Sequence, residues 1–155
     1  PSGSGKTLIA EKLCENERFA NPKTYCTKKS EKHRYLTEQE FDRQEFFEKT
    51  MYAGVKYGTK MEDIEEVLNH GKFAVMPLDM CGAIAMKRHF PTAMIYVARD
   101  KEDMILDIIK SEYAPEEKTL RILSIDAEKR NQEICDYTIN NRQNDGVKEI
   151  LRLLS

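Results

Sequence analysis

The chain opens on PSGSGKT, residues 1–7, where two glycines, a lysine and a threonine stand directly before a helical pattern. Apart from a missing first glycine, this stretch is the phosphate-binding loop pattern G-x-x-x-x-G-K-[ST]. Gly3 and Gly5 allow backbone N–H groups to turn inward around phosphate oxygens, where side chains would block them. A chance turn rich in glycine and serine is the alternative, and the amphipathic segment 6–16 that follows at once argues against it.

The residue types of this loop indicate a nucleoside triphosphate as the ligand. A helix over 6–16 directs its positive end toward an anion held by the loop. Lys6 supplies charge to the β- and γ-phosphates, and the Thr7 hydroxyl is the predicted ligand of Mg²⁺. We therefore expect ATP and Mg²⁺ as cofactors, bound by Ser2, Gly3, Ser4, Gly5, Lys6 and Thr7.

The composition narrows the class of protein further. The 155 residues, 40% of them hydrophobic, suffice for one domain that folds without disulfides or metal. A formal charge of −2 argues against a general nucleic-acid binder, and the apolar runs are far shorter than the roughly 20 residues of a membrane span. The four cysteines form no C-x-x-C pair, which favours reduced thiols in a cytoplasmic protein. We expect a monomer or a homodimer.

Strand and helix patterns alternate along most of the chain. The apolar runs 73–78 and 93–98 are typical of strands buried on both faces of a parallel sheet. Helix patterns cover 81–89, 101–112, 116–135 and 146–154; in the third, Leu120, Leu123 and Ile134 are the apolar anchors. This alternation predicts an α/β fold of the phosphate-loop NTPase type, a parallel sheet flanked by helices. Such a loop follows a strand, so we also expect a strand ahead of Pro1 that this chain lacks.

The segment 28–72 interrupts the alternation and is predicted to form a small lobe of mixed strands. Strand patterns cover 46–52 and 55–57, and a further short one precedes the lobe at 23–27. Thr37-x-x-Glu40 is a capping box that should begin a helix.

Three later features resemble the guanylate kinase family in order and spacing, over nearly the whole chain. Phe46-Phe47-Glu48 is followed by Tyr57-Gly58-Thr59, Asp79-x-x-Gly82 follows a strand pattern, and Lys28 stands where the family has an arginine. The resemblance implies phosphoryl transfer from ATP to GMP by one domain spanning 1–155. It also implies that 28–72 is the substrate-binding lobe and 107–121 a helical lid; lobe and lid close to exclude water.

The resemblance assigns Glu48 to the guanine base. A carboxylate accepts hydrogen bonds from guanine N1–H and the 2-amino group, a donor pair that adenine lacks. A solvated strand carboxylate is the alternative for Glu48, and a helix N-cap is a compatible alternative for Asp79. The implied contacts to the base are Glu48, Thr24, Thr59 and Asp79.

The resemblance also implies which residues hold phosphate. The implied contacts to the GMP phosphate are Lys28, His33 and Tyr57. The alternative for Tyr57 is packing in the core, and the alternative for His33 is an ordinary surface position. Asn140, followed by Asn141, is the implied adenine contact, and a loop cap is the alternative. The implied catalytic cations are Lys6, Lys28 and Arg121.

The chain departs from the family pattern at positions that carry charge. Glu31 falls near the family's second phosphate-binding arginine, and Asp107 and Ser111 occupy two arginine positions of the lid, which leaves Arg121 as the predicted clamp. Each loss removes charge that would stabilise the transferring phosphoryl group. Two alternatives therefore stay open: a kinase of a phosphorylated sugar such as a ribose bisphosphate, and a binding module without catalysis.

Overall fold

The computed structural model describes residues 3–142 and 145–155, which divide into two compact units. Unit 1 comprises residues up to 12 together with 86–155, and unit 2 comprises 13–85. The boundary passes through the end of α1 (Lys6–Leu13) and through α4 (Met80–His89). Within the described residues, no helix combines the length and the apolar character that crossing a bilayer requires.

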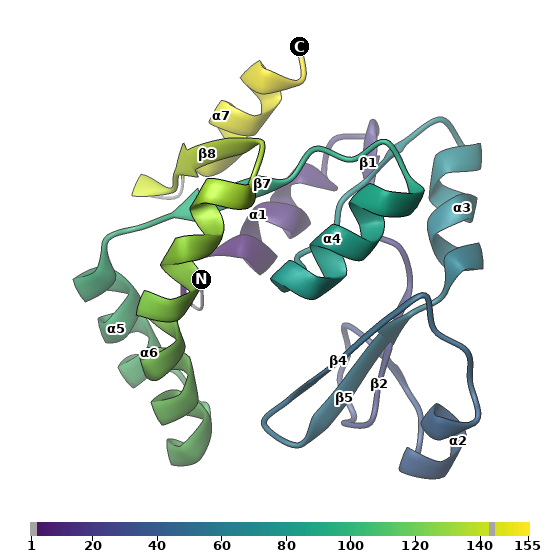
Figure 1. Cartoon of the computed structure of the whole chain (residues 1–155), viewed down its shortest axis with the longest axis horizontal. Coiled ribbons are helices and arrows are strands. Elements are labelled where there is room, and N and C mark those ends of the chain that lie inside the picture. Colours follow the sequence, from purple (N-terminus) through teal and green to yellow (C-terminus); the bar gives the residue numbers. More distant parts are fainter. Residues whose placement is uncertain (1–2, 143–144) are drawn as a thin grey trace. The chain divides into compact units, whose positions relative to one another are not determined.

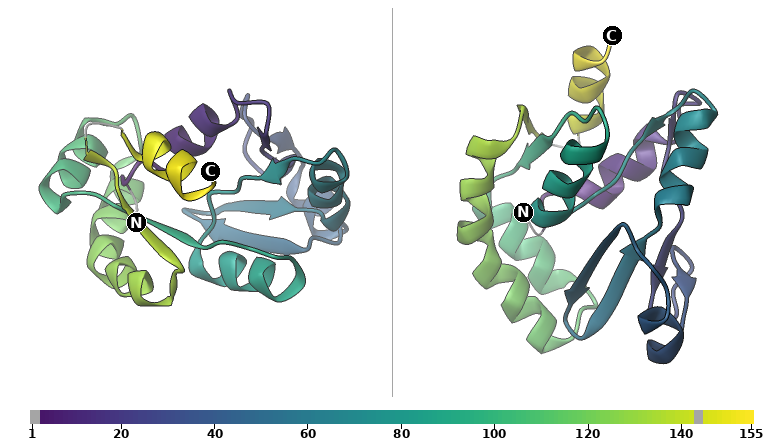
Figure 2. Two further views of the ribbon diagram at one scale, coloured as in Figure 1. Left: turned by 90° about the horizontal axis from the view of Figure 1, so that it is seen from above. Right: turned by 45° about the vertical axis from the view of Figure 1, so that its right-hand side comes forward.

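Unit 1 holds the phosphate loop and most of the C-terminal helices. The strands β7 (Ile95–Ala98) and β8 (Tyr137–Asn140) pair in parallel, with Ile95 opposite Tyr137 and Ala98 opposite Asn140. Figure 2 shows α5 and α6 side by side in both views, because Met104, Ile108 and Ile125 form one buried cluster between them. Besides the unit's parts of α1 and α4, its elements are β7 (Ile95–Ala98), α5 (Lys101–Lys110), α6 (Pro115–Lys129), the 3₁₀ helix η1 (Arg130–Ile134), β8 (Tyr137–Asn140) and α7 (Gly146–Leu153).

Unit 2 is built around a four-stranded sheet of order β3-β2-β5-β4. The β2–β3 pair is parallel and the other two pairs are antiparallel, with β4 and β5 forming the long hairpin seen in Figure 1. The hairpin turns at Ala53-Gly54, where both residues have positive φ. The unit's other elements and the sheet strands are β1 (Phe19–Ala20), β2 (Thr24–Cys26), β3 (Arg34–Tyr35), α2 (Glu38–Asp42), β4 (Glu48–Tyr52), β5 (Val55–Thr59), α3 (Met61–Asn69) and β6 (Phe73–Ala74).

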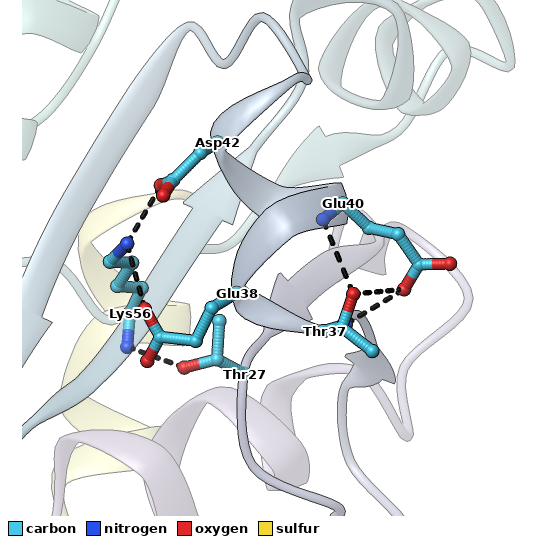
Figure 3. A network of polar contacts seen from close by, with 6 residues as sticks. All are labelled: Thr27, Thr37, Glu38, Glu40, Asp42 and Lys56. Atoms are coloured by element: carbon cyan, nitrogen blue, oxygen red, sulfur yellow. Dashed lines mark hydrogen bonds and ion pairs between the residues drawn. The ribbon is translucent and has the colours of Figure 1, made fainter.

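The helix α2 covers one face of this sheet, which we call the back face. The predicted capping box is confirmed: Thr37 Oγ1 accepts from Glu40 N, and Glu40 Oε2 accepts from Thr37 N (Figure 3). Lys56 Nζ lies 3.0 Å from Glu38 Oε2 and 2.7 Å from Asp42 Oδ1, and these pairs raise the Lys56 pKa (Figure 3).

Aromatic packing completes the back face. Phe46 stacks on Phe41 of α2 at 4.4 Å between ring centroids and lies 5.8 Å from the Tyr25 ring. A Cβ at Gly58 would lie 2.6 Å from the Phe46 ring, so this close approach requires glycine. The back face is therefore fixed by packing, and the opposite face is left for other contacts.

The α/β class is confirmed, but three features differ from the sequence prediction. The predicted parallel sheet is divided into two separate two-stranded pairs, β1–β6 and β7–β8, since a hydrophobic run does not specify its partner. The run 73–78 is a strand only at Phe73–Ala74, and Phe73 is 48% exposed, so it is not buried on both faces. The strand β1 was not predicted, because two residues are too short for a periodicity to appear.

The predicted helix 116–135 is also wrong in its end and in its anchors. It is α-helical to Lys129 and continues as η1. Leu120, Leu123 and Ile134 are exposed, whereas Ile122 and Ile125 face the α5–α6 core. Apolar residues lie on more than one face of this polar helix, and packing against α5 selects the face with Ile122 and Ile125.

Candidate active site

The phosphate loop of unit 1 has the backbone that its glycines predict. Gly3 has φ of 73° and Gly5 has φ of 91°, a left-handed region in which glycine is favoured. The helix α1 begins at Lys6 with Ile9 N donating to Gly5 O at 2.9 Å. Thr7 is exposed in the first turn, while Ser2 lies outside the described residues. The loop therefore ends at a helix N-terminus, the arrangement that binds phosphate.

Two side chains hold carbonyl groups of this loop. Arg99 Nη1 donates to Gly3 O at 2.9 Å, and Asn141 Nδ2 donates to Ser4 O at 2.8 Å. Asn141 is 2% exposed, and a Cβ at Gly5 would lie 2.5 Å from its Nδ2. Sequence reasoning missed Arg99, because nothing in the chain marks a residue 96 positions away as a partner of the loop.

The lysine of the loop lies in a partly desolvated environment. Burial lowers the Lys6 pKa, the Glu128 carboxylate opposes that shift, and the Arg121 guanidinium adds to it. Arg121 and Glu128 are seven residues apart on α6, so they share a helix face. The structure thus brings Lys6 and the predicted clamp Arg121 into one electrostatic neighbourhood.

Arg121 is held in place by two neighbours. Its Nε and Nη2 lie 3.0 and 2.7 Å from Glu117 Oε1, and its guanidinium lies 4.0 Å from the Tyr113 ring centroid. By contrast, Asn140 is exposed at the end of β8, with its backbone N donating to Glu149 Oε2. Asn141 shows the loop-cap alternative, since its Oδ1 accepts from Gly146 N at 3.3 Å.

In unit 2 the predicted substrate residues gather on the sheet face opposite α2, which we call the front face. The register places Thr24 opposite Thr59 and Thr59 opposite Glu48, in one row across three strands. Cross-strand partners share a face, and residues two apart on a strand do so too. Tyr57 therefore lies on the front face beside this row. Four of the predicted residues thus share the front face: Thr24, Glu48, Tyr57 and Thr59.

Glu48 is buried on the front face, at the start of the edge strand β4. It is 8% exposed, and a Cβ at Gly82 would lie 3.0 Å from its Oε1. Burial, with a smaller contribution from the Asp79 carboxylate, raises the Glu48 pKa to about 7. A buried carboxyl group beside a second one is not the solvated surface carboxylate of the alternative interpretation.

Asp79 connects the front face to α4. Its Oδ1 accepts from Gly82 N at 2.8 Å and its Oδ2 accepts from Thr50 Oγ1 at 2.9 Å. The helix N-cap predicted as an alternative is therefore present, and it fixes the carboxylate near Glu48. Sequence reasoning missed Thr50, although its position two residues after Glu48 on a strand places it on the same face.

A second group lies at the β2–β3 end of the front face. The His33 ring packs edge-on against Tyr57 at 5.5 Å between centroids, and His33 Nδ1 lies 2.5 Å from Thr24 Oγ1. Burial, followed by the Lys32 charge, lowers the His33 pKa, which favours a neutral ring. Lys28 is exposed just after β2, and its carbonyl accepts from Cys26 Sγ. The group therefore combines the ring and hydroxyl groups of His33, Tyr57 and Thr24, and Lys28 is an exposed cation two residues after the end of β2.

Comparisons with known proteins show the family to which the chain is related. Residues 1–155 match the family model described as guanylate kinase. The guanylate kinase of Polaromonas sp. is 30% identical, covering 91% of this chain and 76% of that protein; that of Thermotoga maritima is 34% identical, covering 63% and 54%. The crystal structure of guanylate kinase from Anaplasma phagocytophilum shares the fold, with a TM-score of 0.68 at 20% identity, covering 96% of this chain and 81% of that one. This chain belongs to the guanylate kinase family.

Proposed function

We propose that the protein transfers the γ-phosphoryl group of ATP to GMP, giving ADP and GDP. The observation that carries this proposal is the front face of unit 2, where buried Glu48 lies in one row with Thr59 and Thr24. Family membership and the phosphate loop of unit 1 support it from the donor side.

On the acceptor side, the ionised Glu48 carboxylate accepts from guanine N1–H and the 2-amino group. Asp79 and the hydroxyl groups of Thr24 and Thr59 contribute further contacts to the base. Tyr57, His33 and Lys28 hold the GMP phosphate, the last as a point charge rather than a two-pronged guanidinium. A base without the donor pair leaves Glu48 buried and unsatisfied, which is a strong form of discrimination.

On the donor side, the residues present suit a nucleoside triphosphate with Mg²⁺. Gly3 and Gly5 have the positive φ values that let loop N–H groups turn toward a phosphate, and a Cβ on either would crowd Met104 O or Asn141 Nδ2. Thr7 offers one hydroxyl to Mg²⁺, an ion that usually keeps several waters and takes its other ligands from phosphates. Lys6 and Arg121 neutralise charge on the triphosphate, and the metal supplies further charge stabilisation when bound.

No general base is assigned, because the acceptor phosphate is already an anionic nucleophile. Catalysis then depends on positioning and electrostatics, to which Lys6, Lys28 and Arg121 contribute. The two alternatives are not favoured. A sugar phosphate lacks the planar pair of N–H donors that guanine offers to Glu48, and a binding module has no use for the phosphate-binding residues Gly3, Gly5 and Lys6.

A coupled assay tests the proposal with ATP, Mg²⁺ and a panel of acceptors. The panel comprises GMP, dGMP, AMP, UMP and ribose bisphosphate. We expect turnover with GMP and none above background with AMP or UMP. Turnover of ribose bisphosphate without turnover of GMP would establish the sugar-phosphate alternative instead.

GMP affinity should rise as the pH increases through 7. Because the Glu48 pKa is raised to about 7, the free protein carries a neutral carboxyl below that pH and must lose the proton to accept both guanine donors. We expect the Kd for GMP to fall by up to about tenfold per pH unit below 7 and to level off above it. Calorimetric titration between about pH 5.5 and pH 8.5 measures this change.

The GMP phosphate itself titrates near pH 6, so the control must separate the two groups. In Glu48→Gln the step near pH 7 should disappear while the phosphate step remains. An unchanged pH profile in that variant would show that Glu48 does not bind the base.

A further inference from the structure

Asp107 is a position that the resemblance leaves unexplained, since it has a carboxylate where a lid arginine is implied. The structure pairs it with Arg99, whose Nη1 lies 2.5 Å from Asp107 Oδ2. The same nitrogen lies 2.9 Å from Gly3 O. Arg99 follows β7 directly and is largely buried, with 22% of its side chain exposed. One guanidinium thus bridges the phosphate loop and helix α5.

The loop and α5 are also in direct contact at Gly3. A Cβ on this residue would lie 3.1 Å from Met104 O and 3.4 Å from Ile108 Cδ1. Met104, Asp107 and Ile108 are three and four residues apart, so they share one face of α5. Arg99 therefore completes a contact in which a helix face packs against the loop.

The orientation of the loop's carbonyl groups matters for anion binding. A phosphate cradle needs its N–H groups directed inward, and each peptide that turns inward directs its carbonyl outward. Glycine peptides flip easily because glycine tolerates both signs of φ. An outward partner for each carbonyl removes that freedom before the ligand arrives, and such preorganisation lowers the cost of binding.

The loop has such a partner at two successive carbonyls. Arg99 holds Gly3 O, and Asn141 holds Ser4 O while its own Oδ1 accepts from Gly146 N. Asn141 is buried and fixed from two sides, so it needs no further support. Arg99 has a long side chain with many rotamers, and Asp107 restricts it.

We propose that Arg99 is a positioning residue for the phosphate loop and that Asp107 orients it. The carboxylate at 107 then serves to fix the loop rather than to contact the triphosphate. This inference rests on the proposed function only in taking a nucleoside polyphosphate as the loop's ligand. It requires no particular acceptor.

The test measures Mg²⁺-ADP binding by calorimetry in the absence of GMP, together with amide hydrogen exchange of residues 3–7. Arg99→Met should weaken ADP binding about tenfold and speed exchange in the loop, since one charge-assisted hydrogen bond is lost. Arg99→Lys should restore part of both. Asp107→Asn keeps the Gly3 contact and should give a smaller loss, about threefold. GMP affinity should not change in any of them.

Controls separate this inference from the proposed function. Arg88→Met removes an exposed arginine at the end of α4 and should leave both readouts unchanged. Asp107→Arg restores the residue that the resemblance implies; it should weaken ADP binding, and a gain in kcat with unaltered loop exchange would overturn the inference. So would ADP affinity and loop exchange equal to the wild type in Arg99→Met and Asp107→Asn. Failure to phosphorylate GMP leaves these readouts intact and contradicts only the proposed function.

Discussion

Glu48→Gln is expected to lower kcat/KM for GMP by at least about 100-fold while leaving the KM for ATP nearly unchanged. Glutamine keeps the shape of the side chain but offers only one acceptor, and its amide donors face the donors of guanine. The buried site has little water to compensate, as Glu48 is 8% exposed. Steady-state kinetics with each substrate varied in turn measure the effect.

The same substitution should stabilise the fold, which distinguishes a binding role from a structural one. The folded-state pKa of Glu48 is raised from 4.5 to about 7, so the folded protein binds the proton more tightly than the unfolded chain. Stability is therefore lost as the pH rises from 4.5 to 7. Removing the charge should recover about 1–3 kcal/mol at pH 8 and nothing at pH 4, measured by urea unfolding.

The matched control is Glu45→Gln, three residues earlier and exposed. It should change neither GMP turnover nor stability. If Glu48→Gln destabilised the protein at pH 8 and weakened GMP and ATP equally, Glu48 would be structural and the proposed reading of the base would be wrong.

The parts of this site that the sequence predicts are those with local causes. The loop at Gly3 and Gly5 needs positive φ, and only glycine adopts it easily, so the residue type reports the backbone directly. The capping box at Thr37 and Glu40 is likewise a pattern of four residues. The front face follows from the resemblance together with alternation along β4 and β5, since Glu48 and Thr50, or Tyr57 and Thr59, are two apart.

The parts that it does not predict depend on contacts between distant segments. Arg99 and Asn141 reach the loop across 96 and 137 positions, and neither lies in a motif. The raised pKa of Glu48 comes first from burial and then from the Asp79 carboxylate; Asp79 and the closely packed Gly82 belong to another segment of the chain. Leu123 is 71% exposed while Ile125 is buried, because the packing of α5, not hydrophobicity alone, selects the inner face of α6.

Lys6→Met is expected to lower kcat by about 10²–10³-fold, because it removes a preorganised positive charge from the transferring phosphoryl group. Methionine matches the length of the stem, so packing at the start of α1 is kept. Binding of Mg²⁺-ADP should weaken as well, whereas GMP affinity should not change, since the predicted GMP residues lie in unit 2. Rapid-quench measurement of a single turnover isolates the chemical step.

Loss of folding is not expected to explain the fall in kcat, because the partly buried Lys6 ammonium group does not stabilise the folded state. Burial lowers the Lys6 pKa, so the folded state holds the ammonium less favourably than the unfolded chain does. Replacing it by methionine should therefore leave the free energy of unfolding at pH 7 equal or higher. Lys12→Met, an exposed lysine later on the same helix, is the control for charge alone. A Lys6→Met protein whose kcat stays within about threefold of the wild type would show that the loop does not hold the phosphoryl donor.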